Sequence, residues 1–326
     1  MICQDIPLWG AGDKAYLSTY LLYQSDELDA GKKRPAMLVI PGGGYLGTSD
    51  REAEFVALAF AARGYHAFVL RYHVEEEALM PQPILDGFKA VSIIRANAES
   101  WGVDKEKIAA VGFSAGGHLA SAMATMWKQA VFSRKLGLSP EDFRIQAAVL
   151  SYPCTMLHDP IPPVHTGLAA AELEDFRAGM KGLMKQTVYA QDDEVLWDIG
   201  TTMSRCITGK EDPQPEDMMP YSTALLVDED TAPCFVWTTN TDEMVPASHS
   251  LLFVQAMMKK GRNVEFHLFA DGPHGISLGT IETAGEAKML RPDVGVWFDM
   301  AITWLDKTLN IKERTNITPA ALGKVL

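Results

Sequence analysis

The sequence contains few cysteines and no surplus of positive charge. Of its 326 residues only four are cysteine, and they are scattered without a C-x-x-C pair: Cys3, Cys154, Cys206 and Cys234. A disulfide framework or a zinc site needs closer spacing, so we expect isolated thiols and no bound metal. Lys and Arg number 29 against 42 Asp and Glu, which leaves a net charge of −13. This balance argues against a nucleic acid or an anionic membrane surface as a partner.

Long apolar segments are also absent. No apolar run reaches the length of about 18 residues that a membrane-spanning helix requires. The first residues carry neither the basic nor the apolar segment of a signal peptide, which leads us to expect a cytoplasmic location. Internal repeats and low-complexity tracts are missing as well. A globular protein remains as the prediction, and a hydrophobic content of 47% agrees with a well-packed core.

What the sequence does contain is a regular alternation of strand-like and helix-like segments. Short apolar runs predict strands at 15–23, 35–40, 66–72, 107–111, 146–152, 234–238 and 264–269. Helical spacing of apolar residues predicts helices at 50–63, 83–101, 118–128, 247–260 and 294–309. This alternation predicts an α/β fold with a mainly parallel central sheet and helices on both faces, formed by residues 1–326 as a single domain.

One segment interrupts the alternation. About eighty residues separate the strand that ends at Tyr152 from the strand that begins at Cys234, far more than a crossover connection needs. Within this segment, amphipathic spacing predicts helices at 168–184 and 194–206. We interpret residues 155–215 as a helical cap insertion over the carboxyl ends of the strands, where ligands bind in such sheets. A peripheral decoration far from any site is the alternative.

A serine stands at the apex of a strand–turn–helix sequence. The residues Gly112-Phe113-Ser114-Ala115-Gly116 have the G-x-S-x-G spacing, follow an apolar strand and precede a helix. A turn of this kind holds the serine in strained backbone angles and lifts its Oγ away from the sheet. Glycines flank the serine because a Cβ at those positions would collide with the neighbouring strand or helix. The pattern predicts that Ser114 is a nucleophile.

A nucleophilic serine needs a base, and the base needs an acid that orients it. In sheets with this type of turn, the acid and the base follow the serine in the order Ser, Asp or Glu, His. Asp242 lies just past the predicted strand 234–238 and is the predicted acid, with its neighbour Glu243 as the alternative. His274 lies in the loop after the last predicted strand and is the predicted base. For the other histidines we expect structural or surface roles.

Two segments offer the backbone N–H groups that an oxyanion requires. Ala115 follows the nucleophile at the start of a predicted helix, where the helix dipole favours negative charge. Gly42, Gly43 and Gly44 follow an upstream strand, where a second donor is expected. A flexible loop or a phosphate cradle is the alternative for such glycines, but the spacing of the phosphate-binding motifs is absent. Together these features predict a serine hydrolase.

The same residues resemble the α/β-hydrolase superfamily over nearly the whole chain. The resemblance is to the esterase/lipase branch, and within it to carbohydrate esterases of the acetylxylan and feruloyl type. The matching stretches are Ile6-Pro7-Leu8-Trp9, Pro41-Gly42-Gly43-Gly44-Tyr45, Leu85-Asp86-Gly87-Phe88-Lys89-Ala90, Gly112-Phe113-Ser114-Ala115-Gly116-Gly117-His118-Leu119-Ala120, Asp242 with Val245-Pro246, and His274-Gly275.

The resemblance implies a catalytic triad, an oxyanion hole and no metal or organic cofactor. Its residues would be Ser114, Asp242 and His274 for the triad, and Gly43, Gly44 and Ala115 for the N–H donors of the hole. Two departures from the family stand out. Pro41 replaces a histidine that many members have, and the segment 168–206 is longer than expected in this branch.

These features lead to a specific expectation of function. We expect a cytoplasmic esterase that removes acetyl groups from xylo-oligosaccharides or similar sugars through a Ser-His-Asp acyl-enzyme mechanism. The aromatic residues Tyr45, Trp101 and Tyr152, with methionines of the insertion, are expected to form the substrate pocket. A formamidase or general short-chain ester hydrolase of the same fold is the alternative, and a non-catalytic binding module is a remote one. Assembly into a homo-oligomer is left open.

Overall fold

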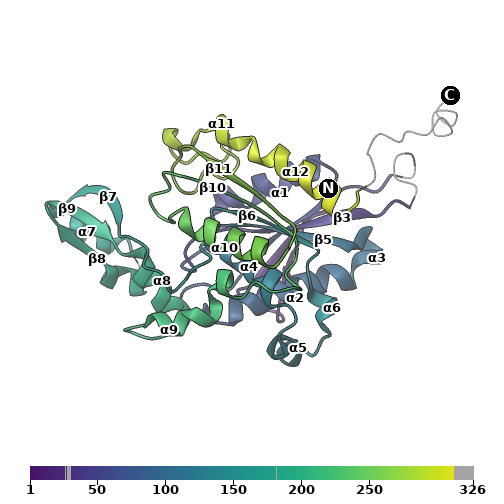
Figure 1. Ribbon diagram of the computed structural model, residues 1–326, viewed down its shortest axis with the longest axis horizontal. Coiled ribbons are helices and arrows are strands. Elements are labelled where there is room, and N and C mark those ends of the chain that lie inside the picture. Colours follow the sequence, from purple (N-terminus) through teal and green to yellow (C-terminus); the bar gives the residue numbers. More distant parts are fainter. Residues whose placement is uncertain (26, 28–30, 181, 312–326) are drawn as a thin grey trace.

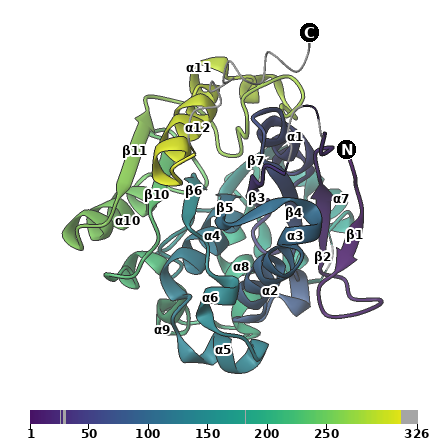
Figure 2. The same cartoon turned by 90° about the vertical axis from the view of Figure 1, so that its right-hand side faces the viewer.

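The computed structural model describes residues 1–25, 27, 31–180 and 182–311. Within these residues, a central sheet of eight strands runs in the order β1-β2-β4-β3-β5-β6-β10-β11 (Figures 1 and 2). Its strands are β1 (Asp5–Pro7), β2 (Tyr16–Tyr20), β3 (Arg34–Ile40), β4 (His66–Arg71), β5 (Val103–Phe113), β6 (Ala147–Ser151), β10 (Cys234–Thr239) and β11 (Val264–Phe269). The strands from β4 to β11 are parallel to their neighbours, whereas β2 pairs antiparallel with β1 and with β4. The predicted mainly parallel sheet is therefore confirmed.

The central strands are buried along almost their whole length. Every residue of β6 and of β10 is buried, and so is β3 from Pro35 to Ile40. A strand that is covered on both faces has no solvent-exposed side, so its sequence is a continuous run of apolar residues and not an alternation of polar and apolar ones. This is why these strands were predictable from the sequence alone.

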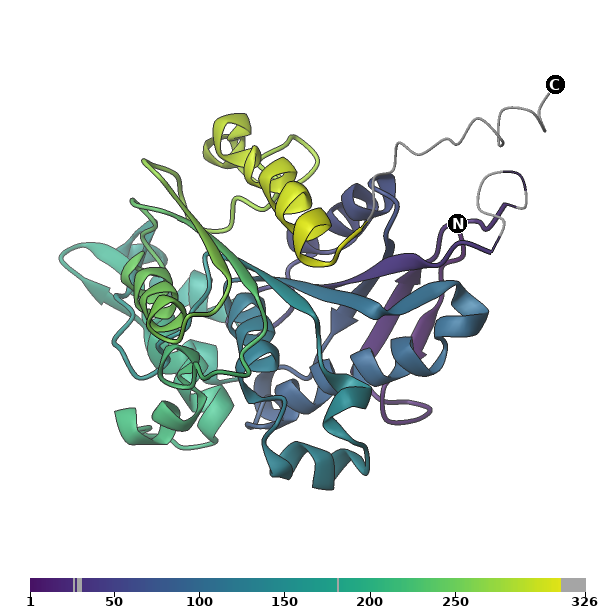
Figure 3. The same ribbon diagram turned by 45° about the vertical axis from the view of Figure 1, so that its right-hand side comes forward.

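Helices cover both faces of the sheet (Figure 3). They are α1 (Glu54–Ala62), α2 (Gln82–Ala96), α3 (Ala98–Trp101), α4 (Ala115–Met126), α5 (Ala130–Leu136), α6 (Pro140–Phe143), α7 (Leu173–Ala178), α8 (Ile199–Thr208), α9 (Pro215–Met218), α10 (Ser248–Lys259), α11 (Pro292–Gly295) and α12 (Trp297–Thr308). Along β3, Met37 and Val39 belong to the apolar cluster that includes residues of α1 and α12, whereas Leu38 and Ile40 belong to the cluster that includes residues of α2, α4 and α10. Successive side chains of a strand point to opposite faces, so each face has its own apolar core.

The register of the sheet places the carboxyl ends of β3 and β5 side by side. Ile40, the last residue of β3, pairs with Gly112 of β5. The glycines after β3 therefore leave the sheet next to the turn at Ser114. The order of the strands reverses at this point, because β4 lies on one side of β3 and β5 on the other. Ligand sites in such sheets lie at this switch point.

The segment between β6 and β10 forms a lobe at one end of the molecule (Figure 1). It contains a small antiparallel sheet in the order β7-β9-β8, made of β7 (Val164–Ala169), β8 (Val188–Gln191) and β9 (Glu194–Trp197). The prediction of a purely helical insertion is corrected by this sheet. Among the described residues of the predicted helix 168–184, only α7 is α-helical, and the predicted helix 194–206 begins with β9 before α8 follows.

The missed hairpin has a local cause. Asp192 and Asp193 form the tight turn between β8 and β9, and both have positive φ angles of 49° and 64°. Two-residue hairpin turns need such angles and are usually recognised in a sequence by Asn-Gly or Asp-Gly. Because two aspartates take these positions, the sequence carries no strong hairpin signal there.

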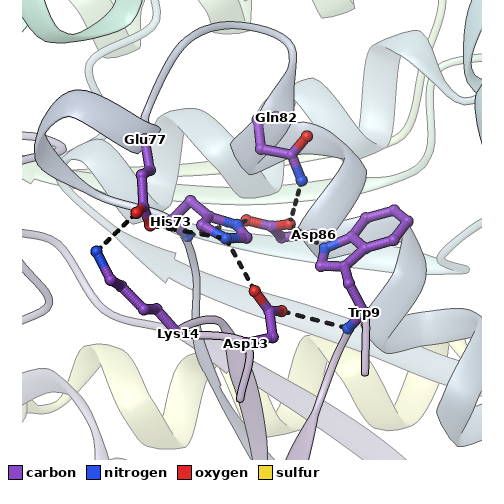
Figure 4. Close-up of polar contacts among 7 residues, drawn as sticks. All are labelled: Trp9, Asp13, Lys14, His73, Glu77, Gln82 and Asp86. Carbon is purple, nitrogen blue, oxygen red and sulfur yellow. Dashed lines mark hydrogen bonds and ion pairs between the residues drawn. The ribbon is translucent and has the colours of Figure 1, made fainter. Parts of the chain in front are cut away.

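A cluster of polar side chains connects the loop between β1 and β2 to α2 and to the segment that precedes α2 (Figure 4). Its members are Trp9, Asp13, Lys14, His73, Glu77, Gln82 and Asp86. Asp86 is fully buried and accepts hydrogen bonds from the indole N–H of Trp9 at 2.7 Å and the backbone N–H of His73 at 2.9 Å. The Nδ1 atom of His73 lies 2.8 Å from the same carboxylate, and its Nε2 lies 3.1 Å from Asp13. The hydrogen bond to Asp86 raises the pKa of His73 against the opposing effect of burial.

The described part of the chain contains no helix with the length and apolar character needed to cross a bilayer. All four cysteines are free thiols; Cys3 is exposed, and Cys154, Cys206 and Cys234 are buried. Burial raises the pKa of Cys154 to about 12 and that of Cys206 to about 11. Because the thiolate is the nucleophilic form, burial disfavours the reactive form of these two cysteines at neutral pH.

Candidate active site

Ser114 occupies the turn between β5 and α4. Its backbone has φ 52° and ψ −117°, a strained conformation for a residue with a side chain. A Cβ at Gly112 would lie 2.1 Å from the carbonyl oxygen of Gly116, and a Cβ at Gly116 would lie 2.1 Å from that of Ile40. Both positions therefore accept only glycine. The tight turn holds the Ser114 side chain beyond the end of the sheet.

The three residues predicted as a triad form a continuous hydrogen-bonded chain. The Oγ atom of Ser114 lies 2.9 Å from Nε2 of His274, and Nδ1 of His274 lies 2.7 Å from Oδ2 of Asp242. The other carboxylate oxygen of Asp242 accepts hydrogen bonds from the backbone N–H groups of Met244 and Val245 at 2.9 and 2.8 Å. The backbone thus fixes the carboxylate so that one oxygen faces the imidazole. This geometry fits a base that takes the serine proton and an acid that fixes the tautomer of the base.

The loops that carry the acid and the base follow the adjacent parallel strands β10 and β11. They are tied to each other by Thr241, whose hydroxyl oxygen accepts the N–H of Gly272 at 2.9 Å. The alternative acid, Glu243, is exposed, and it is Asp242 that contacts His274. The geometry therefore favours Asp242 as the partner of the imidazole.

Opposing effects act on the pKa of His274. Burial lowers it, whereas the carboxylates of Asp242 and Glu52 raise it, and the nearby guanidinium of Arg51 lowers it; the net shift is upward. The ring of Tyr152 packs edge-on against the imidazole with the centroids 4.9 Å apart. The surroundings therefore stabilise the imidazolium that a general base becomes after it accepts a proton.

The glycine loop after β3 lies beside Ser114. Gly43, Gly44 and Ala115 line the same cavity as the serine, and no described residue accepts a hydrogen bond from the backbone N–H of any of the three. Gly43 has a φ of 131°, and a Cβ there would lie 2.3 Å from the carbonyl oxygen of Gly47. The loop therefore requires glycine. It leaves unpaired N–H donors near the serine Oγ, as an oxyanion hole demands.

Glu52 is a site residue that the sequence did not reveal. It is 3% exposed; its Oε2 accepts the backbone N–H of Gly42 at 2.8 Å, and its Oε1 accepts the hydroxyl of Tyr152 at 2.6 Å. The Tyr152 hydroxyl in turn accepts the N–H of Ser277 at 3.0 Å. Glu52 thus links the glycine loop to the loop that carries His274. A single glutamate at the start of a helical segment gives no sign that it is buried.

The aromatic residues expected in the substrate pocket are not part of its wall, and this expectation is corrected. Tyr45 is fully buried, with its hydroxyl 2.5 Å from Nδ1 of His118, whose Nε2 lies 2.7 Å from the carbonyl oxygen of Tyr221. Burial lowers the pKa of His118 to about 4, so the neutral ring donates from Nε2 and accepts the Tyr45 hydroxyl. Tyr152 is 1% exposed, and Trp101 ends the short helix α3 away from the cavity. Tyr45 and Tyr152 connect loops through these hydrogen bonds, and neither is among the residues that line the cavity at Ser114.

A cavity of about 260 Å³ opens at Ser114. Four residues of the insertion, Ile161, Trp197, Ile199 and Met203, form part of its wall. These four residues bring part of the insertion to the cavity, and a cap formed by residues 155–215 stays a prediction. Among the described residues, no group of His, Cys, Asp and Glu side chains is arranged to hold a metal ion.

Comparison with known proteins identifies one family. The BD-FAE family matches residues 23–257. One curated relative is endo-1,4-β-xylanase B of Butyrivibrio fibrisolvens, which is 30% identical over 77% of this chain and 34% of its own length. Another is an acetylxylan esterase of Xylanibacter ruminicola, which is 25% identical over 80% of this chain and 45% of its own length. A solved structure of an α/β hydrolase enzyme from a Medee basin deep-sea metagenome library is 34% identical, covers 95% of this chain and 98% of that chain, and superposes with a TM-score of 0.67.

The chain spans less than half of the length of the two curated relatives. The region matched by the family contains the glycine loop, Ser114 and Asp242, and the likeness to the solved structure covers 95% of the chain. The predicted fold and the predicted resemblance are both confirmed by these comparisons. The chain belongs to the BD-FAE family, within the esterase branch of the α/β hydrolases.

Proposed function

We propose that this protein is a serine carboxylesterase that removes small acyl groups, acetyl foremost, from carbohydrates such as xylo-oligosaccharides. The observation that carries the proposal is the hydrogen-bonded chain from Ser114 through His274 to Asp242, with O–N distances of 2.9 and 2.7 Å. Unpaired N–H donors of Gly43 and Ala115 lie at the same cavity. A nucleophile, a base, an orienting acid and oxyanion donors are the parts that acyl transfer needs.

The first half of the reaction forms an acyl-enzyme. His274 takes the proton of Ser114 while the Oγ attacks the ester carbonyl, and the negative charge that develops on the carbonyl oxygen is bound by the N–H groups of Gly43, Gly44 and Ala115. The resulting imidazolium gives its proton to the leaving alcohol as the ester C–O bond breaks. The acyl group remains on the serine oxygen.

The second half releases the acid. His274 takes a proton from a water molecule, which attacks the acyl-serine carbonyl, and the same N–H groups bind the second oxyanion. The imidazolium returns the proton to the Ser114 oxygen as the acyl–oxygen bond breaks. Asp242 keeps the imidazole in one tautomer and one orientation through both halves.

The small size of the acyl group is inferred from the cavity. A volume of about 260 Å³ lies below the roughly 300–1,000 Å³ of sites for drug-sized ligands. Ile161, Ile199 and Met203 of the insertion narrow it with apolar side chains. A short acyl group fits such a space, while a larger alcohol would extend outside it.

The carbohydrate part of the proposal is supported by the relatives. One is named a xylanase and another an acetylxylan esterase, and the structure shares the fold of an α/β hydrolase at 34% identity. Because this chain covers only part of those two relatives, its own alcohol must be found by experiment.

A series of 4-nitrophenyl esters tests the proposal. We expect kcat/KM to fall steeply from acetate to octanoate, and acetylated xylobiose to lose acetyl groups. Ser114→Ala should reduce kcat by about 10⁶-fold, as in other serine hydrolases that lose the nucleophile. Ser49→Ala is the matched control, because Ser49 lines the same cavity without contacting His274. Efficient cleavage of octanoate would contradict the small-acyl inference, and faster cleavage of N-formylkynurenine than of acetylated xylobiose would favour the formamidase alternative.

A further inference from the structure

Arg51 is a cation on the wall of the cavity that contains Ser114. It belongs to the 3-10 turn Asp50–Glu52, which lies between β3 and α1, and it lines the cavity together with His274. The side chain is half-buried. Besides burial, Arg51 is the group that lowers the pKa of His274 against the upward effect of Asp242. The charge of Arg51 therefore acts electrostatically on His274, the base in the proposed reaction.

Most of the hydrogen-bonding capacity of Arg51 is unused. A guanidinium has five N–H donors, and the acceptor found for it among the described residues is the thioether sulfur of Met289, 2.6 Å from Nη1. A thioether is a weak acceptor. No carboxylate of the described residues lies within ion-pair distance of Arg51, and the adjacent Asp50 pairs instead with Arg71 at 2.7 Å.

Two glycines make room for the Arg51 side chain. A Cβ at Gly275 would lie 3.3 Å from its Nη2, and a Cβ at Gly285 would lie 3.3 Å from its Cδ. Larger residues at either position would press on the arginine. Much of the remaining cavity wall is apolar, with Ile199 and Met203 among its members. A guanidinium that meets a weak acceptor in such a place gains most from a carboxylate, whose two oxygens match its planar fork.

We propose that Arg51 binds a carboxylate of the substrate, so that the enzyme prefers esters that carry an acidic group close to the bond that is cleaved. This inference rests on the proposed ester hydrolysis at Ser114. The carboxylate can belong to the acyl group, as in a half-ester of a dicarboxylic acid, or to the alcohol, as in an acetylated sugar acid. A neutral substrate of the same shape leaves the charge of Arg51 unmatched.

Two pairs of matched substrates test the proposal and separate its two sources. The acyl pair is the mono-4-nitrophenyl ester of succinic acid and the corresponding ester of succinamic acid. The alcohol pair is 4-acetoxybenzoate and 4-acetoxybenzamide. We expect the wild type to favour the anionic member of one pair by roughly ten- to hundredfold in kcat/KM, the size of a hydrogen bond between charged groups. Arg51→Met should abolish this ratio, and Arg51→Lys should keep part of it because the charge remains without the fork.

Lys288→Met is the control for general loss of positive charge. Lys288 precedes Met289 in the chain but is exposed and pairs with Glu286, so its removal should leave the ratio unchanged. Ratios near one in the wild type, or an equal loss on anionic and neutral esters in Arg51→Met, would show that the arginine only holds the loop and would overturn the proposal. Failure of the wild type to cleave 4-nitrophenyl acetate would instead overturn the proposed function together with it.

Discussion

Replacing Glu52 with glutamine removes a buried negative charge at nearly constant side-chain volume. In the wild type both carboxylate oxygens accept hydrogen bonds, one from the backbone N–H of Gly42 and one from the hydroxyl of Tyr152. A glutamine can still accept the Gly42 N–H with its oxygen. Its amide N–H group then meets Tyr152, whose hydroxyl must turn to accept. Both hydrogen-bonded contacts of residue 52 therefore survive the substitution, but the negative charge of the carboxylate is lost.

The structure sets the size and the sign of the effect. Hydrogen bonds to a charged group are worth about 1.5–3 kcal/mol and those between neutral groups about 0.5–1.5 kcal/mol, so two weakened bonds should cost about 2–3 kcal/mol of unfolding free energy. The Glu52 carboxylate also raises the pKa of His274. A nearby charge at an effective dielectric constant of about 20 contributes about 1–2 kcal/mol. Its loss should therefore lower kcat/KM about five- to thirtyfold, since the imidazolium loses stabilisation.

The pH profile separates this electrostatic effect from a loss of structure. The base is active when unprotonated, and removal of Glu52 lowers the pKa of His274, so the acidic limb of kcat/KM for 4-nitrophenyl acetate should move to lower pH. Glu54→Gln is the control, because Glu54 lies two residues away on the exposed surface of α1. An unchanged acidic limb in Glu52→Gln, with activity within twofold of the wild type, would refute the reasoning.

Three further predictions test other parts of the site and the fold. Asp242→Asn should lower kcat on 4-nitrophenyl acetate by about 10⁴-fold because the imidazole loses its tautomer, while Glu243→Gln should stay close to wild type; equal losses would contradict the assignment of the acid. Gly43→Ala should lower kcat about 10²–10³-fold through the disturbed oxyanion loop, because a Cβ there would lie 2.3 Å from a backbone oxygen; a normal kcat would argue against this loop as donor. The folded state raises the pKa of His73 through its hydrogen bond to Asp86, so this group stabilises the fold below its unfolded pKa and loses that contribution as pH rises through the folded pKa. Urea titrations should show this fall as the pH rises above about 6.5, the ordinary histidine pKa, in the wild type and not in His73→Gln, and parallel curves would contradict it.

Sequence reasoning succeeded where the fold leaves few options. A continuous apolar run such as 35–40 can hardly be anything but a covered strand, and the glycines around Ser114 are required by contacts of 2.1 Å. The order of Ser114, Asp242 and His274 follows from the order of the strands that carry them. The structure brings these three side chains together as the order predicted.

Sequence reasoning failed where the type of a residue does not determine its burial or its hydrogen-bond partners. Glu52 and Glu54 are both glutamates near the start of α1, yet the first is buried beneath the glycine loop and the second is exposed. Tyr45 and Tyr152 were expected at the substrate because they are aromatic residues around the predicted site, but their hydroxyls are hydrogen-bonded to His118 and Glu52 inside the fold. Which partner a polar group finds depends on long-range packing that no local pattern records.

The arrangement of contacts implies that reaction and specificity can change independently. Glu52 binds the N–H of Gly42 directly and, through Tyr152, the N–H of Ser277, so we expect a substitution of Glu52 to disturb the glycine loop and the loop of His274 together. The insertion meets the cavity through side chains such as Ile199 and Met203, which bond to neither Ser114 nor the base. Changes in the insertion should therefore alter which acyl groups fit, while the hydrogen-bonded chain of Ser114, His274 and Asp242 stays intact. In the proposed function, the hydrogen-bonded chain from Ser114 through His274 to Asp242 cleaves the ester bond, whereas side chains of the insertion and Arg51 select the substrate.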